Sequence, residues 1–354
     1  ARQEALRQFG DLASVRGSMI ALDEQQRRAG RRADLLSDLR QDALYGWRAL
    51  RRNLAMTAVI VFALAIGIGA NTAVFTLIDA LLLRPIAVDH PEQLVTIGDE
   101  DFVNSSGRGT PHVDVFSAPL YRDLGERNDV FLDVLATGPA GGVFVRAGGA
   151  PEHERPKARY VSANFFSLLG VRAFLGRTSD ARLDDRVGLS PVVTISHGYW
   201  VSRFQSDPGV IGREILVNGV AMTIVGVPAR AFTGEVVGQS TDMWLPLSMH
   251  DALRPAVRLL DDRAAVWLLA IGRLKPGGTL ERARQRLEPL IVTSILRNAT
   301  PQVAKAFETR PRHFVAVSGA RGLSEVRVTF KSPLLTVLAG VALLLCIMCA
   351  NVAN

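Results

Sequence analysis

The sequence has little cysteine and little lysine, and both shortages exclude functions. Its two cysteines, Cys346 and Cys349, both lie in the apolar C-terminal run. The long polar part of the chain before this run therefore has no cysteine and cannot form an internal disulfide. None of the four lysines follows a glycine: Lys157, Lys275, Lys305 and Lys331. Because a P-loop needs a Gly-Lys-Ser/Thr element whose lysine reaches the phosphates, the sequence excludes an ATP site of that kind.

Motifs of enzymes and metal sites are also missing. The six histidines are scattered, without an H-x-x-x-H or H-E-x-x-H spacing. The segment "SHGYW" places Ser196 beside His197, but the G-x-S-x-G turn of a serine hydrolase is absent, so we expect His197 to be a surface or turn residue. Adjacent side chains do not converge on one substrate, so two carboxylate pairs are expected to be solvated charges: Asp184-Asp185 and Asp261-Asp262. We predict no catalytic residue, no metal and no cofactor.

A first apolar run begins at Leu54. Between Leu54 and Ala70 the only polar side chain is Thr57, and apolar character continues to about Ala73. A membrane span takes roughly 20 mostly apolar residues, which this run supplies. A secretory signal peptide fits poorly, because a long polar segment precedes the run and no small-residue cleavage site ends it. The run therefore predicts a transmembrane helix.

A second apolar run, "SPLLTVLAGVALLLCIMCANVAN", closes the chain. It carries no charge between Leu334 and Ala350, which predicts a second span. Its Cys-x-x-Cys pair has no histidine or acid nearby, so we interpret both cysteines as packing residues rather than a redox or metal pair. The sequence begins at Ala1 rather than Met and stops at Asn354, where such a helix would leave the membrane. We expect a fragment of a longer membrane protein.

The net charge of +7 is concentrated at the N-terminus. Residues 1–53 hold eleven arginines against seven acids, while the rest of the chain has 30 basic and 27 acidic residues. Basic residues beside spans stay in the cytoplasm, so the N-terminus is expected inside and the domain between the spans outside; Lys331 opposes this only mildly. Without a basic stripe interleaved with aromatic residues, the excess favours membrane lipid over nucleic acid as a partner.

The predicted segments follow from these runs. Apolar residues at spacings of three or four and an arginine-rich polar face mark an amphipathic helix that lies in the membrane interface. In chain order we predict a cytoplasmic helical prefix (1–33), this interfacial helix (34–53), a first transmembrane helix extending outside (54–83), a large external domain (84–333) with a β-rich part at about 178–248, and a second transmembrane helix (334–354).

The sequence of the external domain predicts both helices and strands. The segment 118–131 predicts a short helix with Pro119 in its first turn. A hairpin is predicted from strands 213–217 and 220–227 around an Asn218-Gly219 turn, because these two residues tolerate positive φ. Residues 266–278 predict a buried strand that ends in a Pro-Gly turn.

A longer helix is expected over 279–298, with Thr279 as its N-cap. Pro289 should kink this helix. Its core stripe is predicted as Leu280, Ala283, Leu287, Leu290 or Ile291, and Ser294 or Ile295.

Several blocks in fixed order carry a family resemblance. The run "RALRRNLAMTAVIVFALAIGIGANTAVFTLIDALLLRPI" is followed by "VSANFFSLLGVRAFLGR" (161–177), "HGYWVSRFQSDPGVIGREILVNGVAMTIVGV" (197–227), "DMWLPL" (242–247) and "GRLKPGGTLERARQRLEPL" (272–290). The prefix "ALRQFGD" (5–11) and the closing "CANVAN" complete the set. The chain resembles the MacB/FtsX-type ABC transporter permeases, and most narrowly the acidobacterial duplicated orphan permeases.

The resemblance implies a fold and a location. It implies transmembrane α-helices flanking an α+β extracytoplasmic domain, a MacB-like periplasmic core with a porter-like part and a smaller β-rich part. The start of a truncated FtsX-like permease domain would come next, without its cytoplasmic coupling region. The implied location is the bacterial inner membrane, in a multi-pass protein with a cytoplasmic N-terminus and a periplasmic domain.

It also implies a non-enzymatic function. The chain would be the permease subunit of an ABC-type exporter or mechanotransmission complex, passing the motion of a separate ATPase subunit to its periplasmic domain. Further implied partners are a second permease half or a second copy of the chain, and periplasmic or outer-membrane proteins.

Polar and small residues in the first span fit this mechanism. At a rise of ~1.5 Å per residue, Leu54 to Asp79 measures ~37 Å, which exceeds the ~30 Å hydrocarbon layer. Gly67 and Gly69 would allow close helix approach, one to the second span and the other to a partner permease half, since they lie on different faces. Asn71 is expected to hydrogen-bond a neighbouring helix. These three residues are the predicted helix-packing site.

One alternative from another class stays open. A two-span membrane sensor would place the same external domain outside the cell to bind a ligand. The two hypotheses differ in the sequence expected beyond Asn354: further spans for a permease, and a signalling module for a sensor.

Overall fold

The computed structural model of the chain describes residues 51–52, 54–79, 86–99, 116–147, 154–184, 187–237, 239–297, 299–309, 311, 313–322 and 325–353. The predicted prefix (1–33) and nearly all of the predicted interfacial helix (34–53) lie outside these residues. The chain divides into two compact units. One comprises Ala1–Ala73 and Leu338–Asn354, and the other comprises Val74–Val337.

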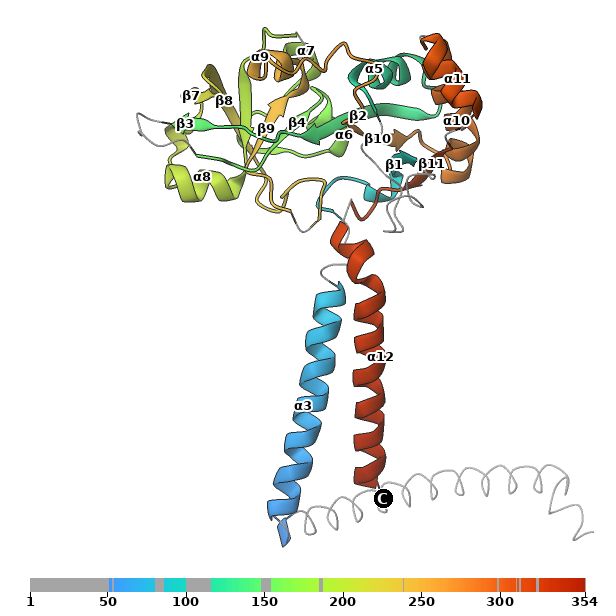
Figure 1. Cartoon of the computed structure of the whole chain (residues 1–354). Coiled ribbons are helices and arrows are strands. Elements are labelled where there is room, and N and C mark those ends of the chain that lie inside the picture. Colours follow the sequence, from blue (N-terminus) through green and yellow to red (C-terminus); the bar gives the residue numbers. More distant parts are fainter. Residues whose placement is uncertain are drawn as a thin grey trace, which may run out of the picture. The chain divides into compact units, whose positions relative to one another are not determined.

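Two long helices dominate the first unit. Helix α3 (Leu54–Ile78) and helix α12 (Glu325–Ala353) run antiparallel, side by side (Figure 1). The stretches Thr57–Ile78 and Ser332–Ala350 are long and apolar enough to cross a membrane, and almost none of their residues are fully buried. Inside α3 the hydroxyl of Thr72 donates to the carbonyl of Ile68 at 2.8 Å, so this polar side chain is satisfied within its own helix.

In the described part of the second unit, eleven strands form one mixed sheet. Strands follow the order β11-β1-β10-β2-β4-β9-β6-β8-β7-β3, with β5 paired to β8. Most neighbours are antiparallel, and β4–β9 and β6–β8 are parallel. The strands are β1 (Leu94–Asp99), β2 (Phe131–Pro139), β3 (Val145–Ala147), β4 (Ala158–Val161), β5 (Ala173–Gly176), β6 (Val192–Ile195), β7 (Glu214–Val217), β8 (Val220–Pro228), β9 (Met243–Pro246), β10 (Leu269–Leu274) and β11 (Phe314–Ser318).

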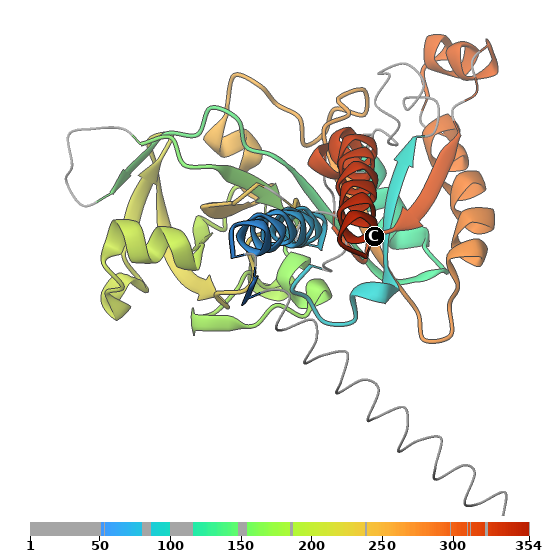
Figure 2. The same cartoon turned by 90° about the horizontal axis from the view of Figure 1, so that it is seen from below.

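Helices cover the sheet and its ends. They are α5 (Ala118–Arg127), α6 (Phe165–Leu169), α7 (Ala181–Asp184), α8 (His197–Phe204), α9 (His250–Leu253), α10 (Leu280–Arg297) and α11 (Pro301–Thr309), with short 3-10 turns η2 (Pro91–Gln93), η3 (Pro208–Val210) and η4 (Leu247–Met249). Strands β7 and β8 with α8 lie at one end of the domain, and β1, β11 and α10 lie at the other (Figures 1 and 2).

Hydrophobic side chains fill both faces of the sheet. Along β10, Ala270 belongs to the larger core, whereas Leu269 and Ile271 belong to the smaller one. This alternation follows from the two-residue period of a strand. Leucines of α5 and α10 close the larger core, and Phe165 and Phe166 of α6 close the smaller one. Every residue of β10 is buried, as predicted for this segment.

Several local predictions are confirmed. Helix α5 begins after Ser117, whose hydroxyl accepts from the Leu120 amide, and Pro119 lies in its first turn. Asn218 and Gly219 have φ of 48° and 85°, so the predicted hairpin closes with both turn residues left-handed.

Helix α10 also agrees with its predicted pattern. The hydroxyl of Thr279 accepts from the amide of Arg282 at 3.2 Å, which is an N-cap contact. The buried residues of the helix are Ala283, Leu287, Ile291 and Ser294, at the spacing of one core-facing stripe.

The segment predicted as a β-rich part joins the main sheet without a break. Strand β9 pairs in parallel with β4 and antiparallel with β6. Strands β3 and β5, which lie outside 178–248, pair with β7 and β8. Hydrogen bonds therefore connect this part to the rest of the domain through β9.

A buried aromatic cluster lies beside β4. Tyr160 has no exposed surface, and its ring packs edge-on against His250 at 4.9 Å and Trp267 at 5.9 Å between centroids. Burial raises the pKa of Tyr160 to about 12. Among the described residues, its hydroxyl has no hydrogen-bond partner.

This cluster makes a stability prediction. Replacing Tyr160 by Phe keeps the ring and removes an unpaired polar atom, so the free energy of unfolding at pH 7 should change by less than about 1 kcal/mol. Tyrosine ionises near pH 10 when unfolded, so wild type should lose about 2–3 kcal/mol between pH 10 and 12, and Tyr160→Phe should lack this part of the loss. Urea unfolding of both chains across that range measures the difference. If the free energy of unfolding of both chains depended on pH in the same way, the raised pKa assigned to Tyr160 would be contradicted.

Candidate functional site

A seam of half-buried side chains joins α3 and α12. Their spacing of three or four residues is typical of two helices packed along their length. On α3 the seam holds Thr57, Ala63, Leu64, Gly67, Ala70 and Asn71, and on α12 it holds Leu338, Val341, Ala342, Leu345 and Met348. Most other described side chains of the two apolar stretches are exposed.

Gly67 is buried, and it faces α12 at a point where an added side chain has little room. A Cβ atom at Gly67 would lie 2.3 Å from Cε of Met348 and 3.2 Å from Cδ1 of Leu345. An alanine would displace the flexible end of Met348, whereas a leucine would need the space of both neighbours. Gly69 is exposed, and a Cβ there would meet nothing within 4 Å. Asn71 lies half-buried on the Gly67 side.

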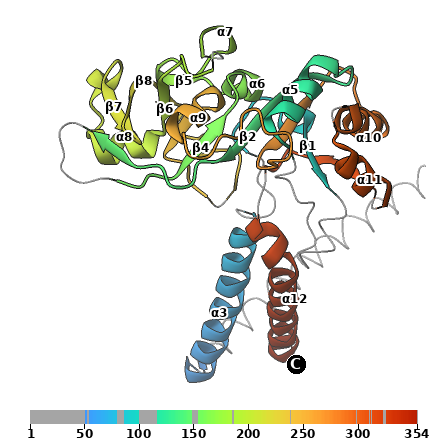
Figure 3. The same cartoon turned by 45° about the horizontal axis from the view of Figure 1, so that its top comes forward.

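A cleft of about 590 Å³ lies between α5 and the segment 247–261. Helices α5 and α9 lie on the same side of the sheet there (Figure 3). Tyr121, Val134 and Leu247 give the cleft apolar walls. Among the described residues, its charged lining is one arginine, Arg122, and four acids: Glu126, Asp133, Asp251 and Asp261.

Hydrogen bonds engage most of these charges. Arg122 donates to the carbonyl of Leu260 and to Asp261, which ties the far wall to α5. A carboxylate oxygen of Asp251 accepts from the ring of His250 and from the amide of Leu259. The acids therefore shape the cleft.

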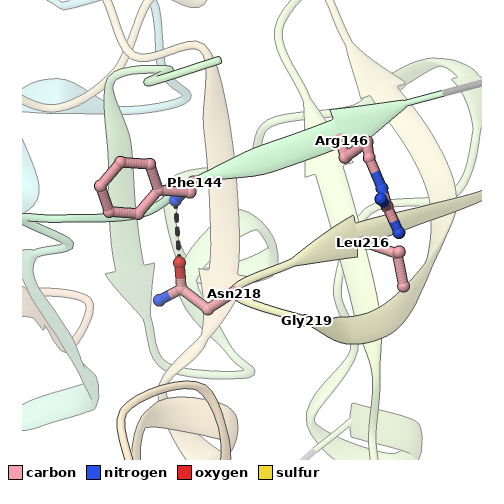
Figure 4. Close-up of a pocket in the computed structure, with 5 residues that line it drawn as sticks. All are labelled: Phe144, Arg146, Leu216, Asn218 and Gly219. Carbon is pink, nitrogen blue, oxygen red and sulfur yellow. Dashed lines mark hydrogen bonds between the residues drawn. The ribbon is translucent and has the colours of Figure 1, made fainter. Parts of the chain in front are cut away.

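A smaller hollow of about 310 Å³ lies beside the β7–β8 turn (Figure 4). Phe144, Arg146 and Leu216 line it. The side-chain oxygen of Asn218 accepts from the amide of Phe144 at 2.8 Å, and its nitrogen donates to the carbonyl of Leu253. Asn218 therefore connects the hairpin to its surroundings in addition to forming the turn.

The prediction that Asp184 is a solvated charge is wrong. Its side chain is buried, and both carboxylate oxygens accept from the guanidinium of Arg177, at 2.7 and 3.1 Å. The Asp180 amide donates to the same carboxylate. Asp184 is buried because the chain returns past Arg177 at this point, and the sequence spacing alone gives no sign of this return. Asp261 is exposed, as predicted.

The Ser196–His197 pair has a structural explanation. The hydroxyl of Ser196 accepts from the amide of Tyr199 and caps α8. His197, the first residue of the helix, packs its ring edge-on against Phe174 and Trp200. The described part of the chain also contains no group of three His, Cys, Asp or Glu side chains that could hold a metal ion.

Comparison with known families identifies the family to which the chain belongs. The sequence profile of the MacB-like periplasmic core domain matches residues 57–290, about two thirds of the chain. The chain belongs to the MacB-like periplasmic core domain family. The resemblance to MacB/FtsX-type ABC permeases is thereby confirmed, whereas the narrower acidobacterial likeness stays a prediction. A search of curated proteins gives no match.

Solved structures are similar at low identity. A domain of a permease protein from Porphyromonas gingivalis is 17% identical with a TM-score of 0.47, over 66% of this chain and 94% of that one. The periplasmic region of MacB from Actinobacillus actinomycetemcomitans is 13% identical with a TM-score of 0.45, over 64% and 89%. The extracellular domain of the noncanonic ABC-type transporter YknZ from Gram-positive bacteria is 10% identical with a TM-score of 0.40, over 63% and 99%.

Two aspartates of the periplasmic core domain offer a matched test. Asp184→Asn should lower the free energy of unfolding by about 1–3 kcal/mol, because a buried carboxylate with three donors is lost. Asp261→Asn removes an exposed ion pair and should cost less than about 0.5 kcal/mol. Urea denaturation of both variants beside wild type measures the two effects. Equal effects would contradict the burial assigned to Asp184.

Proposed function

We propose that this chain is a non-catalytic permease subunit of an ABC-type exporter or mechanotransmission complex, of the acidobacterial orphan type. Family membership carries the proposal, since it makes the chain a component of permease-type ABC transporters. Helices α3 and α12 would carry the motion of a separate ATPase to the periplasmic domain. The same membership favours a permease over a two-span sensor.

The sequence supports an external source of energy. It contains no Gly-Lys element for a P-loop, so ATP hydrolysis would take place on a separate ABC ATPase subunit. A second permease half or a second copy would complete the membrane part. Periplasmic or outer-membrane proteins are further proposed partners.

We place the protein in the bacterial inner membrane, as a multi-pass protein with a cytoplasmic N-terminus and a periplasmic domain at 84–333. Two apolar helices and the arginine-rich N-terminal flank support this placement. The limits of the five predicted segments are part of the proposal.

Orientation can be tested with a reporter enzyme that is active only outside the cytoplasm. Fused near Ser190, beside the exposed Leu189, it should be active, and fused near Arg32 it should be inactive. The physical reason is that the arginines before α3 resist translocation. Activity at Arg32 and none at Ser190 would overturn the proposed orientation.

Gly67, Gly69 and Asn71 are the proposed helix-packing residues. Contact of Gly67 with Met348 and Leu345 supports a role in pairing α3 with α12. The exposed Gly69 leaves a flat surface on another face of α3, where a helix of a second permease half would pack. Asn71 would hydrogen-bond a neighbouring helix.

Leucine substitutions test this assignment. Leu is at least as favourable as Gly against lipid, so Gly67→Leu and Gly69→Leu should leave the insertion of the full-length protein near normal. Gly67→Leu should weaken disulfide trapping between cysteine pairs placed on α3 and α12, because overpacking costs about 1–3 kcal/mol. Gly69→Leu should keep that trapping, yet lower the stimulation of the ATPase. Full trapping and full stimulation in both variants would show that the glycines face lipid.

A further inference from the structure

The segments that enter and leave the domain are hydrogen-bonded to each other. The incoming segment is 86–93, and the outgoing segment is 319–322. The amide of Ile86 donates to the carbonyl of Ala320 at 3.3 Å. The amide of Gly319 donates to the carbonyl of Leu94 at 2.7 Å, one residue past the incoming segment. The domain is therefore closed where its chain begins and ends.

Arg273 fastens the incoming segment to the sheet. It lies on β10, between β1 and β2, and is only 7% exposed. Its guanidinium donates to the carbonyls of Asp89 at 2.7 Å, His90 at 3.1 Å and Leu168 at 2.8 Å, and to the side chain of Gln93 at 3.2 Å. Burial lowers the pKa of Arg273 from its ordinary value. The planar guanidinium of Arg273 thus connects α6, the incoming segment and strand β10.

Gly170 closes the other side of the incoming segment. It ends α6 with a φ of 71°, and a Cβ atom there would lie 2.4 Å from Cβ of Asp89. The amide of Asp89 donates to the carbonyl of Leu169 at 3.0 Å. The segment therefore lies so close to α6 that no side chain fits at position 170.

The outgoing segment lies against the backbone at Glu235, a residue with a buried carboxylate. A Cβ atom at Gly322 would lie 2.5 Å from Cγ2 of Ile86 and 2.7 Å from the carbonyl of Glu235. The side chain of Glu235 is fully buried, accepts from the hydroxyl of Thr137 at 2.8 Å and pairs with Arg159. Glu235, against whose backbone Gly322 lies, is thus bonded through its side chain to β2 and β4.

We propose that Arg273 and Gly170 lock the incoming and outgoing segments to the sheet as one rigid joint, so that force from the membrane moves the domain as a unit. Arg273 is a positioning residue in this joint. That the joint transmits force rests on the proposed function. The rigidity of the joint can be measured without any assumption about function.

Amide hydrogen exchange of the full chain in detergent measures that rigidity. In wild type, the amides of Ile86, Asp89 and Gly319 should exchange as slowly as those of β10. Gly170→Ala should speed exchange at 86–94 about tenfold or more, because its methyl group pushes Asp89 away. Gly142→Ala is the matched control: its φ is 72° and a Cβ there meets nothing within 4 Å, so 86–94 should exchange as in wild type.

A second pair of variants isolates the guanidinium. Arg273→Lys keeps the charge but loses the fork, so it should speed exchange at 86–94 and leave β6 unchanged. Arg286→Lys, at an exposed pair with Asp129, should change neither region. The proposal is overturned if 86–94 already exchanges like an exposed loop in wild type, if Arg273→Lys behaves like wild type, or if both glycine variants act alike.

An engineered disulfide distinguishes failure of the proposed joint from failure of the proposed function. In a chain with Cys346→Ala and Cys349→Ala, Ile86→Cys and Ala320→Cys should form a disulfide, and a rigid joint predicts that oxidation leaves the stimulation of the ATPase unchanged. Loss of stimulation on oxidation would show a hinge and overturn the joint. If no ATPase responds to the reduced chain, the proposed function fails, and the exchange experiment still decides the joint.

Discussion

A guanidinium buried inside a sheet loses its hydration, and its charge must be compensated by acceptors held in place around it. At Arg273 these acceptors are three backbone carbonyls and an amide oxygen. Because the acceptors belong to the incoming segment (86–93) and to α6, a residue of the interior strand β10 holds both in position. The smaller core depends on the same contact, since Phe165 and Phe166 reach the sheet from α6.

Different physics holds the helical unit together. In lipid there is no hydrophobic gain from pairing two apolar helices, so small residues that allow close approach decide where they meet. Gly67 is such a residue, and its neighbours on α12 are the flexible side chains of Leu345 and Met348. This contact lies between apolar side chains, in contrast to the hydrogen-bonded packing around Arg273.

Local rules predict much of this chain from its sequence. Asn218-Gly219 indicates the hairpin because few residue pairs tolerate two positive φ values, and Thr279 indicates the start of α10 because its hydroxyl can cap a helix. The opposite faces of Gly67 and Gly69 result from helix geometry alone.

Contacts outside a single helix, strand or tight turn cannot be predicted in this way. Two adjacent acids in a loop-like sequence predict a solvated charge at Asp184. No feature of the surrounding sequence indicates that the chain turns back and brings Arg177 to this carboxylate. Arg273 stands in a run of apolar residues, but its acceptors lie more than a hundred positions away in the sequence. Gly170 is part of a family block without any sign that its missing side chain makes room for Asp89.

The central claim is that nucleotide-driven motion changes the helix pair and moves the domain as a rigid body. Spin-label distances in the full-length protein, in complex with the proposed ATPase subunit, test it most directly. One label pair belongs at the exposed positions Ile66 and Ile347, and the other at Leu132 and Val201 in the domain. On addition of a non-hydrolysable ATP analogue, the first distance should change and the second should stay the same. A constant helix distance with a changed distance inside the domain would contradict the account.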